Sequence, residues 1–307
     1  MSASPPPALL RPSTLPELTR DALVDWLIIG ALWVLMARAP SLYLLWAVLI
    51  AGRLHSLGVL VHDAVHLNLA RARRERPLLV RIFELIAAYP IATTLDAMRY
   101  HHLRHHRDNA LPTDPYFKEG IRAQPLRWWL TCLRGLLMLP FWSTRPYGGA
   151  VALLSARARI FYARVYLQDR SGAPEEALAA SPEVWACARA ELGQLAAQLP
   201  LWWGLWVGSE AVTYGVCVPM LFTGVFVVYR LLWEHTYTPA ADRRPESVMQ
   251  TTNDHHLGPL SRVFLAPKHV GHHLAHHLHP TAGWRALPVV RAWYLAREPL
   301  RYPRDPR

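Results

Sequence analysis

The sequence predicts an all-α integral membrane protein with about four transmembrane helices, arranged as two hairpins, and a cytoplasmic helical cap that carries clustered histidines. Two observations lead to this prediction. Long apolar stretches occur in pairs, and each pair is joined by only a few residues. Of the 307 residues, 52% are hydrophobic and 18% are charged, a balance that favours a membrane over water as the solvent for part of the chain.

The two hairpins are predicted from the lengths of the apolar stretches and of their links. Residues 22–36 and 42–61 form the first pair, and residues 195–208 and 212–233 form the second. A link of a few residues forces neighbouring helices to run antiparallel, so the outer ends of each pair lie on the same side of the membrane. The second link contains Glu210 and no lysine or arginine, as expected for a loop that faces away from the cytoplasm.

Arginines recur between the hairpins, from residue 67 to residue 191, and the positive-inside rule assigns this segment to the cytoplasm. Both termini then share the cytoplasmic side. Within the segment, residues 78–95 and 128–142 are apolar but short, or interrupted by arginine and proline. Interfacial or re-entrant helices suit them better than full spans. The alternative is that the two segments span the membrane as a pair, which keeps the same sidedness.

The chain divides into one domain with two short tails. Residues 1–20 are proline-rich and lack an apolar signal region, which predicts a disordered cytosolic tail. Residues 21–299 form the predicted membrane domain, and residues 300–307 form a second disordered tail.

Charge and cysteine content exclude several classes of protein. The net charge is +11, but the arginines are scattered between apolar runs, which indicates contacts with lipid head groups rather than with nucleic acid. No module that reads nucleic acid is recognisable. Cys132, Cys187 and Cys217 are far apart, so neither a disulfide framework nor a thiolate metal site is expected.

Three histidine clusters share a helical spacing that places imidazoles on one face. Their members are His62 and His66, then His102, His105 and His106, then His273, His276 and His277. A further histidine, His235, follows the fourth apolar stretch on the same predicted side. A single such pair is more often incidental, but nine imidazoles at one membrane face exceed the four ligands of a tetrahedral zinc and suit two metals with open positions. Nitrogen ligands fit zinc, copper, nickel and iron alike, so the ligand type alone leaves the metal open.

Acidic and further histidine side chains accompany these clusters. Asp63, Asp114 and Glu234 are candidate acceptors for ligand N–H groups, with surface or helix-cap roles as equal alternatives. His55 lies two helical turns before His62 in an apolar stretch, which indicates a packing or supporting role.

The ordered motifs H-D-x-x-H, Y-x-H-L-x-H-H and H-H-L-x-H-H-L-x-P, with E-H between the last two, resemble the membrane fatty-acid desaturase superfamily. That superfamily includes alkane monooxygenases and carotenoid ketolases and hydroxylases. The resemblance runs from about residue 58 to residue 280 and includes Asp114-Pro115-Tyr116. It departs at Gly271 and Ala275, where the family often has Asn and Glu, and these changes remove two side chains that could contact the metal ligands. His255, His256 and His272 are possible substitutes, although solvent-exposed positions suit them better.

The resemblance implies a centre of two iron ions that uses dioxygen. Its implied ligands are His62, His66, His102, His105, His106, His235, His273, His276 and His277. The implied reaction is desaturation of a lipid acyl chain in the membrane, and the alternative is hydroxylation or ketone formation on a carotenoid or another lipid. A membrane metal transporter or sensor is disfavoured because the second hairpin carries almost no polar residues.

Electrons must come from a separate protein. The sequence has no H-P-G-G haem motif, no four-cysteine ferredoxin pattern and no G-x-G-x-x-G nucleotide loop. An external ferredoxin or cytochrome with its reductase is therefore expected. The basic cytoplasmic face suits an acidic carrier, in which case added salt should weaken electron transfer.

Overall fold

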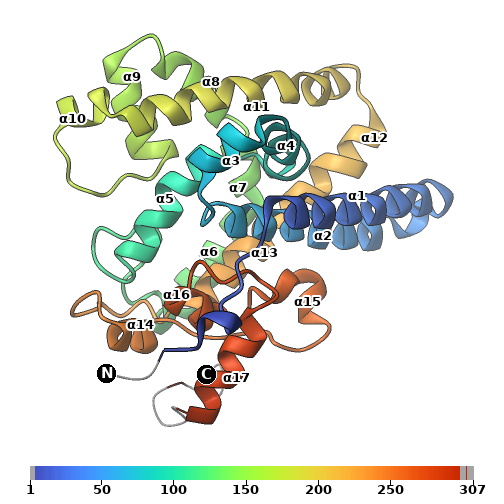
Figure 1. Cartoon of the computed structure of the whole chain (residues 1–307). Helices are drawn as coiled ribbons and strands as arrows, with labels where there is room; N and C mark the ends of the chain where they lie inside the picture. Colours follow the sequence, from blue (N-terminus) through green and yellow to red (C-terminus); the bar gives the residue numbers. More distant parts are fainter. Residues whose placement is uncertain (1–3, 298–301, 303–307) are drawn as a thin grey trace.

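The computed structural model describes residues 4–297 and residue 302, and within this part of the chain the regular structure is helical (Figure 1). The one β-type contact there is an isolated bridge between His235 and Thr252. The prediction of an all-α protein is confirmed. The α-helices are α1 (Leu15–Arg38), α2 (Tyr43–Ala64), α3 (Leu69–Glu75), α4 (Pro77–Phe83), α5 (Leu95–Arg107), α6 (Pro125–Arg134), α7 (Met138–Trp142), α8 (Arg145–Ala152), α9 (Ala156–Phe161), α10 (Glu175–Ala180), α11 (Pro182–Trp206), α12 (Glu210–Val212), α13 (Val218–Glu234), α14 (Pro245–Thr251), α15 (Ser261–Phe264), α16 (His273–Leu278) and α17 (Leu287–Arg297). The 3-10 and π-helical turns are η1 (Pro7–Leu9), η2 (Pro40–Leu42), η3 (Glu84–Ala88), η4 (Tyr89–Ile91), η5 (Ile121–Ala123), η6 (Gly135–Leu137), η7 (Tyr162–Tyr166), η8 (Thr213–Cys217) and η9 (Pro267–His269).

Two helical stretches of the described chain are long and apolar enough to cross a membrane, namely Pro40–Ala64 and Glu210–Glu234. A third candidate is the bent pair Pro77–Ile91 and Leu95–Arg107, whose two arms differ in direction by 70°. The break follows Ala92, which has a φ of 55° and ends the first arm in a left-handed conformation. The helices α1 and α11 are as long but less apolar, so the arrangement of four spans in two hairpins stays a prediction.

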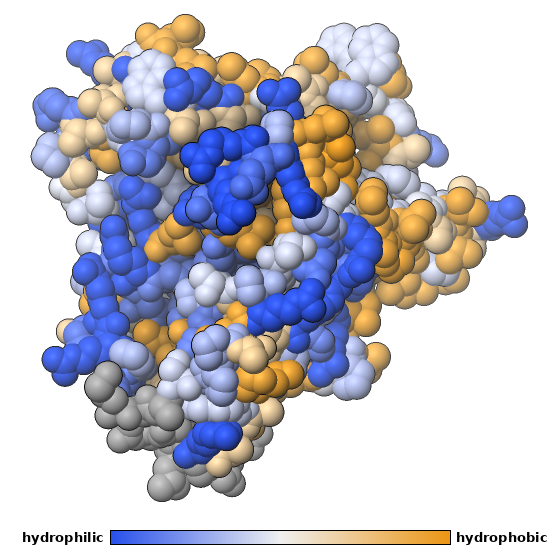
Figure 2. All heavy atoms as spheres, viewed as in Figure 1, coloured by the Kyte–Doolittle hydropathy of each residue, from blue (hydrophilic) through white to orange (hydrophobic). Residues whose placement is uncertain are grey.

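Helix α2 packs against both α1 and α13, and α11 packs against α8. In Figure 1, α12 and the turn between α1 and α2 lie on the right, away from α14 and α16. Figure 2 shows hydrophobic residues gathered over this right-hand part, whereas hydrophilic residues cover the centre and left. Leu27 on α1 is 75% exposed and Leu44 on α2 is 51% exposed. Apolar side chains on the outside of a hairpin are expected where lipid replaces water.

Helix α1 begins inside the segment that the sequence analysis assigned to a disordered tail. Thr14 accepts a hydrogen bond from the Glu17 backbone N–H, and the Glu17 side chain accepts one from the Thr14 backbone in return. This reciprocal cap fixes the first turn of the helix at Leu15. The predicted tail at residues 300–307 lies outside the described residues, apart from Tyr302, whose hydroxyl donates to Asp254 at 2.8 Å.

Helix α13 crosses η6 with backbone against backbone. A Cβ atom added to Gly135 would lie 2.7 Å from the Gly224 carbonyl oxygen, and one added to Gly224 would collide with the Gly135 carbonyl oxygen. Glycine at both positions is therefore what allows the segment after α6 to lie directly on α13.

The variant Gly224→Ala should destabilise the protein by about 1–3 kcal/mol, because the new methyl group forces this crossing apart. The measurement is the midpoint of thermal denaturation in detergent. Gly30→Ala is the matched control, since a Cβ there meets nothing within 4 Å and alanine favours a helix. Equal midpoints for the two variants would contradict the close packing.

Candidate metal centre

Four segments bring the histidine clusters to one place. His62 ends α2, and His66 lies in the turn just after it. One face of α5 carries the second cluster, α16 carries the third, and His235 directly follows α13. Since α2 packs on both α5 and α13, the ends of these helices meet. The spacings of three and four residues then turn the imidazoles inward from each side.

The first group of converging ligands consists of His62, His66, His102 and His276, whose candidate ligand nitrogens all lie within 4.8 Å of one another. The His66 and His102 Nε2 atoms are 3.0 Å apart. Metal–nitrogen bonds of about 2.1 Å place neighbouring ligand nitrogens roughly 3.0–3.4 Å apart. The first group thus has the spacing that one metal ion requires.

The second group consists of His105, His235, His273 and His277, again with all ligand nitrogens within 4.8 Å. All four residues are buried. Both ring nitrogens of His235, and Nε2 of His105, of His273 and of His277, are buried without a hydrogen-bond partner. Buried imidazole nitrogens without partners cost free energy unless an ion binds them, so this group also fits a metal.

The ninth histidine of the predicted set, His106, lies between the two groups. Its Nε2 atom is 3.0 Å from Nε2 of His102 and 3.0 Å from Nε2 of His276. Its ring also stacks on that of His277, with the centroids 4.2 Å apart. The structure therefore brings all nine predicted histidines together.

The protonation state of the third cluster suits metal binding. Burial, reinforced by neighbouring imidazoles, holds the pKa of His273, His276 and His277 well below the ordinary value. The same cause lowers the pKa of His235. These side chains are neutral at pH 7, so their lone pairs are available to a metal.

Two of the three candidate carboxylates contact the histidines, both in the second group. An Asp114 Oδ1 atom lies 2.8 Å from His105 Nδ1. A Glu234 Oε1 atom lies 3.3 Å from His273 Nδ1 and 3.1 Å from Arg230 Nε. Carboxylates in these positions fix the orientation of the imidazole and raise its basicity. Asp63 lies elsewhere, with its Oδ2 atom 3.5 Å from the Trp284 backbone nitrogen.

The remaining histidines have other surroundings. His101 turns away from the centre, as predicted, and its Nδ1 is 2.6 Å from the Tyr116 hydroxyl. The prediction that His255, His256 and His272 are solvent-exposed is wrong. His255 is fully buried, with Nε2 3.6 Å from Glu234, His272 is 7% exposed, and His256 is half-buried. The His255 backbone N–H donates to the Gly271 carbonyl oxygen at 2.8 Å, a contact between two segments that the sequence pattern alone does not indicate.

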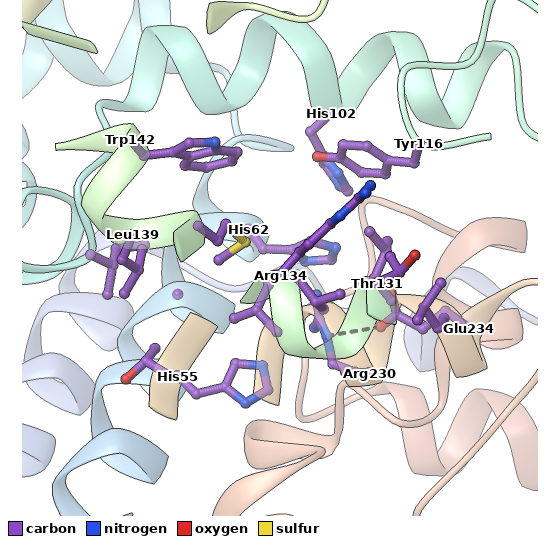
Figure 3. A pocket seen from close by; sticks show the side chains of 18 of the residues that line it. His55, His62, His102, Tyr116, Thr131, Arg134, Leu139, Trp142, Arg230 and Glu234 are labelled. Carbon is purple, nitrogen blue, oxygen red and sulfur yellow. Dashed lines mark ion pairs between the residues drawn. The ribbon is translucent and has the colours of Figure 1, made fainter. Parts of the chain in front are cut away.

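A cavity of about 690 Å³ opens beside the histidines (Figure 3). His62, His102, His105 and His273 are among its lining residues, so both groups reach it. Most of its other lining is aliphatic or aromatic, supplied mainly by α2, α13 and the segment from α6 to α7. An apolar cavity next to a metal centre suits the hydrocarbon part of a ligand.

Sequence reasoning did not single out Arg230, and it gave His55 only a packing or supporting role. Arg230 lines the cavity and forms an ion pair with Glu234, one helical turn further along α13. His55 also lines it, with Nδ1 2.6 Å from the Phe264 carbonyl oxygen and a buried Nε2 that has no partner. The sequence does indicate this ion pair, because an arginine and a glutamate four residues apart in an apolar helix rarely occur without a role.

Comparison with known proteins identifies a family that covers the cavity and the nine histidines. Residues 39–304 match the model of a family described as fatty acid desaturase. A search of curated proteins returned no match. The matched region begins just before η2 and includes all nine histidines of the centre.

Proposed function

Since the chain belongs to the fatty acid desaturase family, we propose that it desaturates a lipid acyl chain in the membrane, with two iron ions and dioxygen. The observation that carries this proposal is the pair of four-histidine groups, joined by His106, on the wall of one apolar cavity. The proposed iron ligands are His62, His66, His102, His105, His106, His235, His273, His276 and His277. An all-imidazole pair of sites supports two redox-active ions better than one zinc, which four ligands saturate.

Bound iron would supply the dioxygen-dependent removal of hydrogen from an unactivated methylene group. The protein holds the ligands neutral and oriented, with Asp114 on His105 and Glu234 on His273. The aliphatic and aromatic cavity wall excludes water and positions the chain beside the centre. How the substrate carbon sits relative to the centre decides whether a double bond, an alcohol or a ketone results.

The proposed setting is an integral membrane protein with four spans in two hairpins, and with both termini and the histidines on the cytoplasmic side. The two apolar stretches Pro40–Ala64 and Glu210–Glu234 support it. So does the exposure of apolar side chains along α1 and α2. In this setting a lipid reaches the cavity from the bilayer, and an external ferredoxin or cytochrome with its reductase supplies electrons from the cytosol.

The test is mass spectrometry of lipids and pigments from a heterologous host that expresses the wild type or His276→Ala. We expect a product lighter by two hydrogen atoms in the wild type alone. A product heavier by one oxygen atom would assign hydroxylation, and a gain of one oxygen with loss of two hydrogens would assign ketone formation. Purified wild type that holds zinc and no iron would overturn the proposal.

A further inference from the structure

Three cationic side chains line the cavity without a carboxylate partner among the described residues. They are Lys118, in the loop between α5 and η5, and Arg127 and Arg134, at either end of α6. The hydrogen bond of the Lys118 ammonium is to the Tyr116 carbonyl oxygen, at 3.3 Å. Arg230, by contrast, is neutralised by Glu234. The cavity therefore combines an apolar wall with an excess of positive charge.

Arg127 and Arg134 line the cavity from α6, and both side chains are also exposed. Arg127, Thr131 and Arg134 lie at helical spacing and all line the cavity. The opposite face of α6 is apolar and open: Leu126 is 74% exposed and Trp129 is 59% exposed. A helix at a membrane surface ordinarily turns its cations toward water and head groups. Here Arg127 and Arg134 are exposed and also line the cavity, so an anion at its opening can reach them. Figure 3 shows Arg134 extending from α6 toward Tyr116.

Lys118 adds a second, independent observation. Burial, together with the nearby positive charges of Arg170 and Arg127, lowers the pKa of its ammonium group to about 8, although Asp114 acts in the opposite direction. A partly buried ammonium group without an acidic partner is destabilised. A bound anion would offset that cost by supplying the missing partner.

We propose that the cavity binds a single-chain lipid with an acidic head group, which Lys118, Arg127 and Arg134 hold while the chain runs past His62 along the apolar wall. This assignment rests on the proposed function and names the class of its substrate. A carboxylate or a phosphate head group has the required chemistry, because both accept hydrogen bonds from guanidinium and ammonium groups. A neutral wax, alkane or carotene lacks it.

The test compares three ligands of equal chain length on purified, iron-loaded protein in neutral detergent. Hexadecanoate and hexadecyl phosphate carry an acidic head group, and hexadecanol does not. We expect the wild type to bind the better of the two anions at least about tenfold more tightly than hexadecanol, and that anion identifies the head group. Arg134→Gln and Lys118→Gln should each remove most of this preference and leave hexadecanol affinity unchanged. Equal affinity of wild type for anions and alcohol would overturn the assignment.

Arg157→Gln is the matched control, since Arg157 is an exposed arginine that is not among the cavity-lining residues. The preference should survive this substitution, and its loss there would point to a general charge effect and overturn the assignment. Iron content and product mass, measured on the same preparations, separate the two proposals. A wild type that shows no preference for anions, but holds iron and forms product, refutes the head-group site alone. A wild type without iron refutes the proposed function.

Binding should also depend on pH through Lys118. The ammonium group is charged below its pKa of about 8 and loses its charge above it, so affinity for an anion should fall between pH 7 and pH 9. Hexadecanesulfonate is the probe, because it stays anionic over this range. Lys118→Arg keeps the charge and should flatten the dependence. The same fall in the arginine variant would contradict the role of Lys118.

Discussion

Replacing His276 with alanine is expected to remove at least one of two bound metal ions and to lower product formation by at least about 10²-fold. His276 belongs to the first group of ligands, and its Nε2 atom is also 3.0 Å from that of His106. Its loss leaves the first group with three of its four members and removes the contact that orients His106. The measurement is the amount of iron and zinc bound per protein chain by elemental mass spectrometry, beside product formation.

His279→Ala is the control for this experiment. His279 lies three residues further along, outside both groups, and its Nε2 contacts the Tyr294 hydroxyl at 2.8 Å. Metal content should remain at the wild-type level. If both variants lost metal equally, the cause would be a disturbed C-terminal segment, and if neither did, His276 would not be a ligand.

Spacing along a helix predicted the histidine centre because ligands at three- and four-residue intervals necessarily share a face. The same rule explains the result for Asp63. It directly follows His62 on α2, and successive helical residues point about 100° apart. Its carboxylate therefore faces Trp284 rather than the imidazoles. Asp114 lies in a loop, where spacing gives no direction, and its contact with His105 becomes evident only in the structure.

The sequence did not predict the cationic lining of the cavity, for a related reason. An amphipathic helix has a polar and an apolar face, but its sequence does not state which face meets lipid and which meets protein. The 128–142 segment was predicted to be interfacial, and the exposed leucines and tryptophan of α6 are compatible with that prediction. That Arg134 lines the cavity depends on where η6 packs, which the Gly135–Gly224 crossing determines.

Asp114→Asn is expected to weaken metal binding in the second group by about 10–100-fold and to leave the first group occupied. One carboxylate oxygen of Asp114 meets both His105 Nδ1 and the Tyr116 backbone N–H at 2.8 Å, and the other accepts from the Ala110 backbone N–H at 3.0 Å. An asparagine keeps only one acceptor oxygen. Its NH2 group must therefore oppose either the His105 and Tyr116 N–H groups or the Ala110 N–H. The first orientation removes the acceptor of His105 and the second disturbs the loop that positions it, so His105 is held less firmly.

The measurement is iron bound per chain during titration with a chelator. Wild type should release its iron in one late phase, whereas Asp114→Asn should lose about half of it early, because only the second group is weakened. Asp63→Asn makes the same chemical change at a buried carboxylate that lacks an imidazole contact, and it should titrate like wild type. Early loss in both variants would trace the effect to general stability. Wild-type retention in Asp114→Asn would mean that His105 is held by its packing against His235 and His277 rather than by the carboxylate.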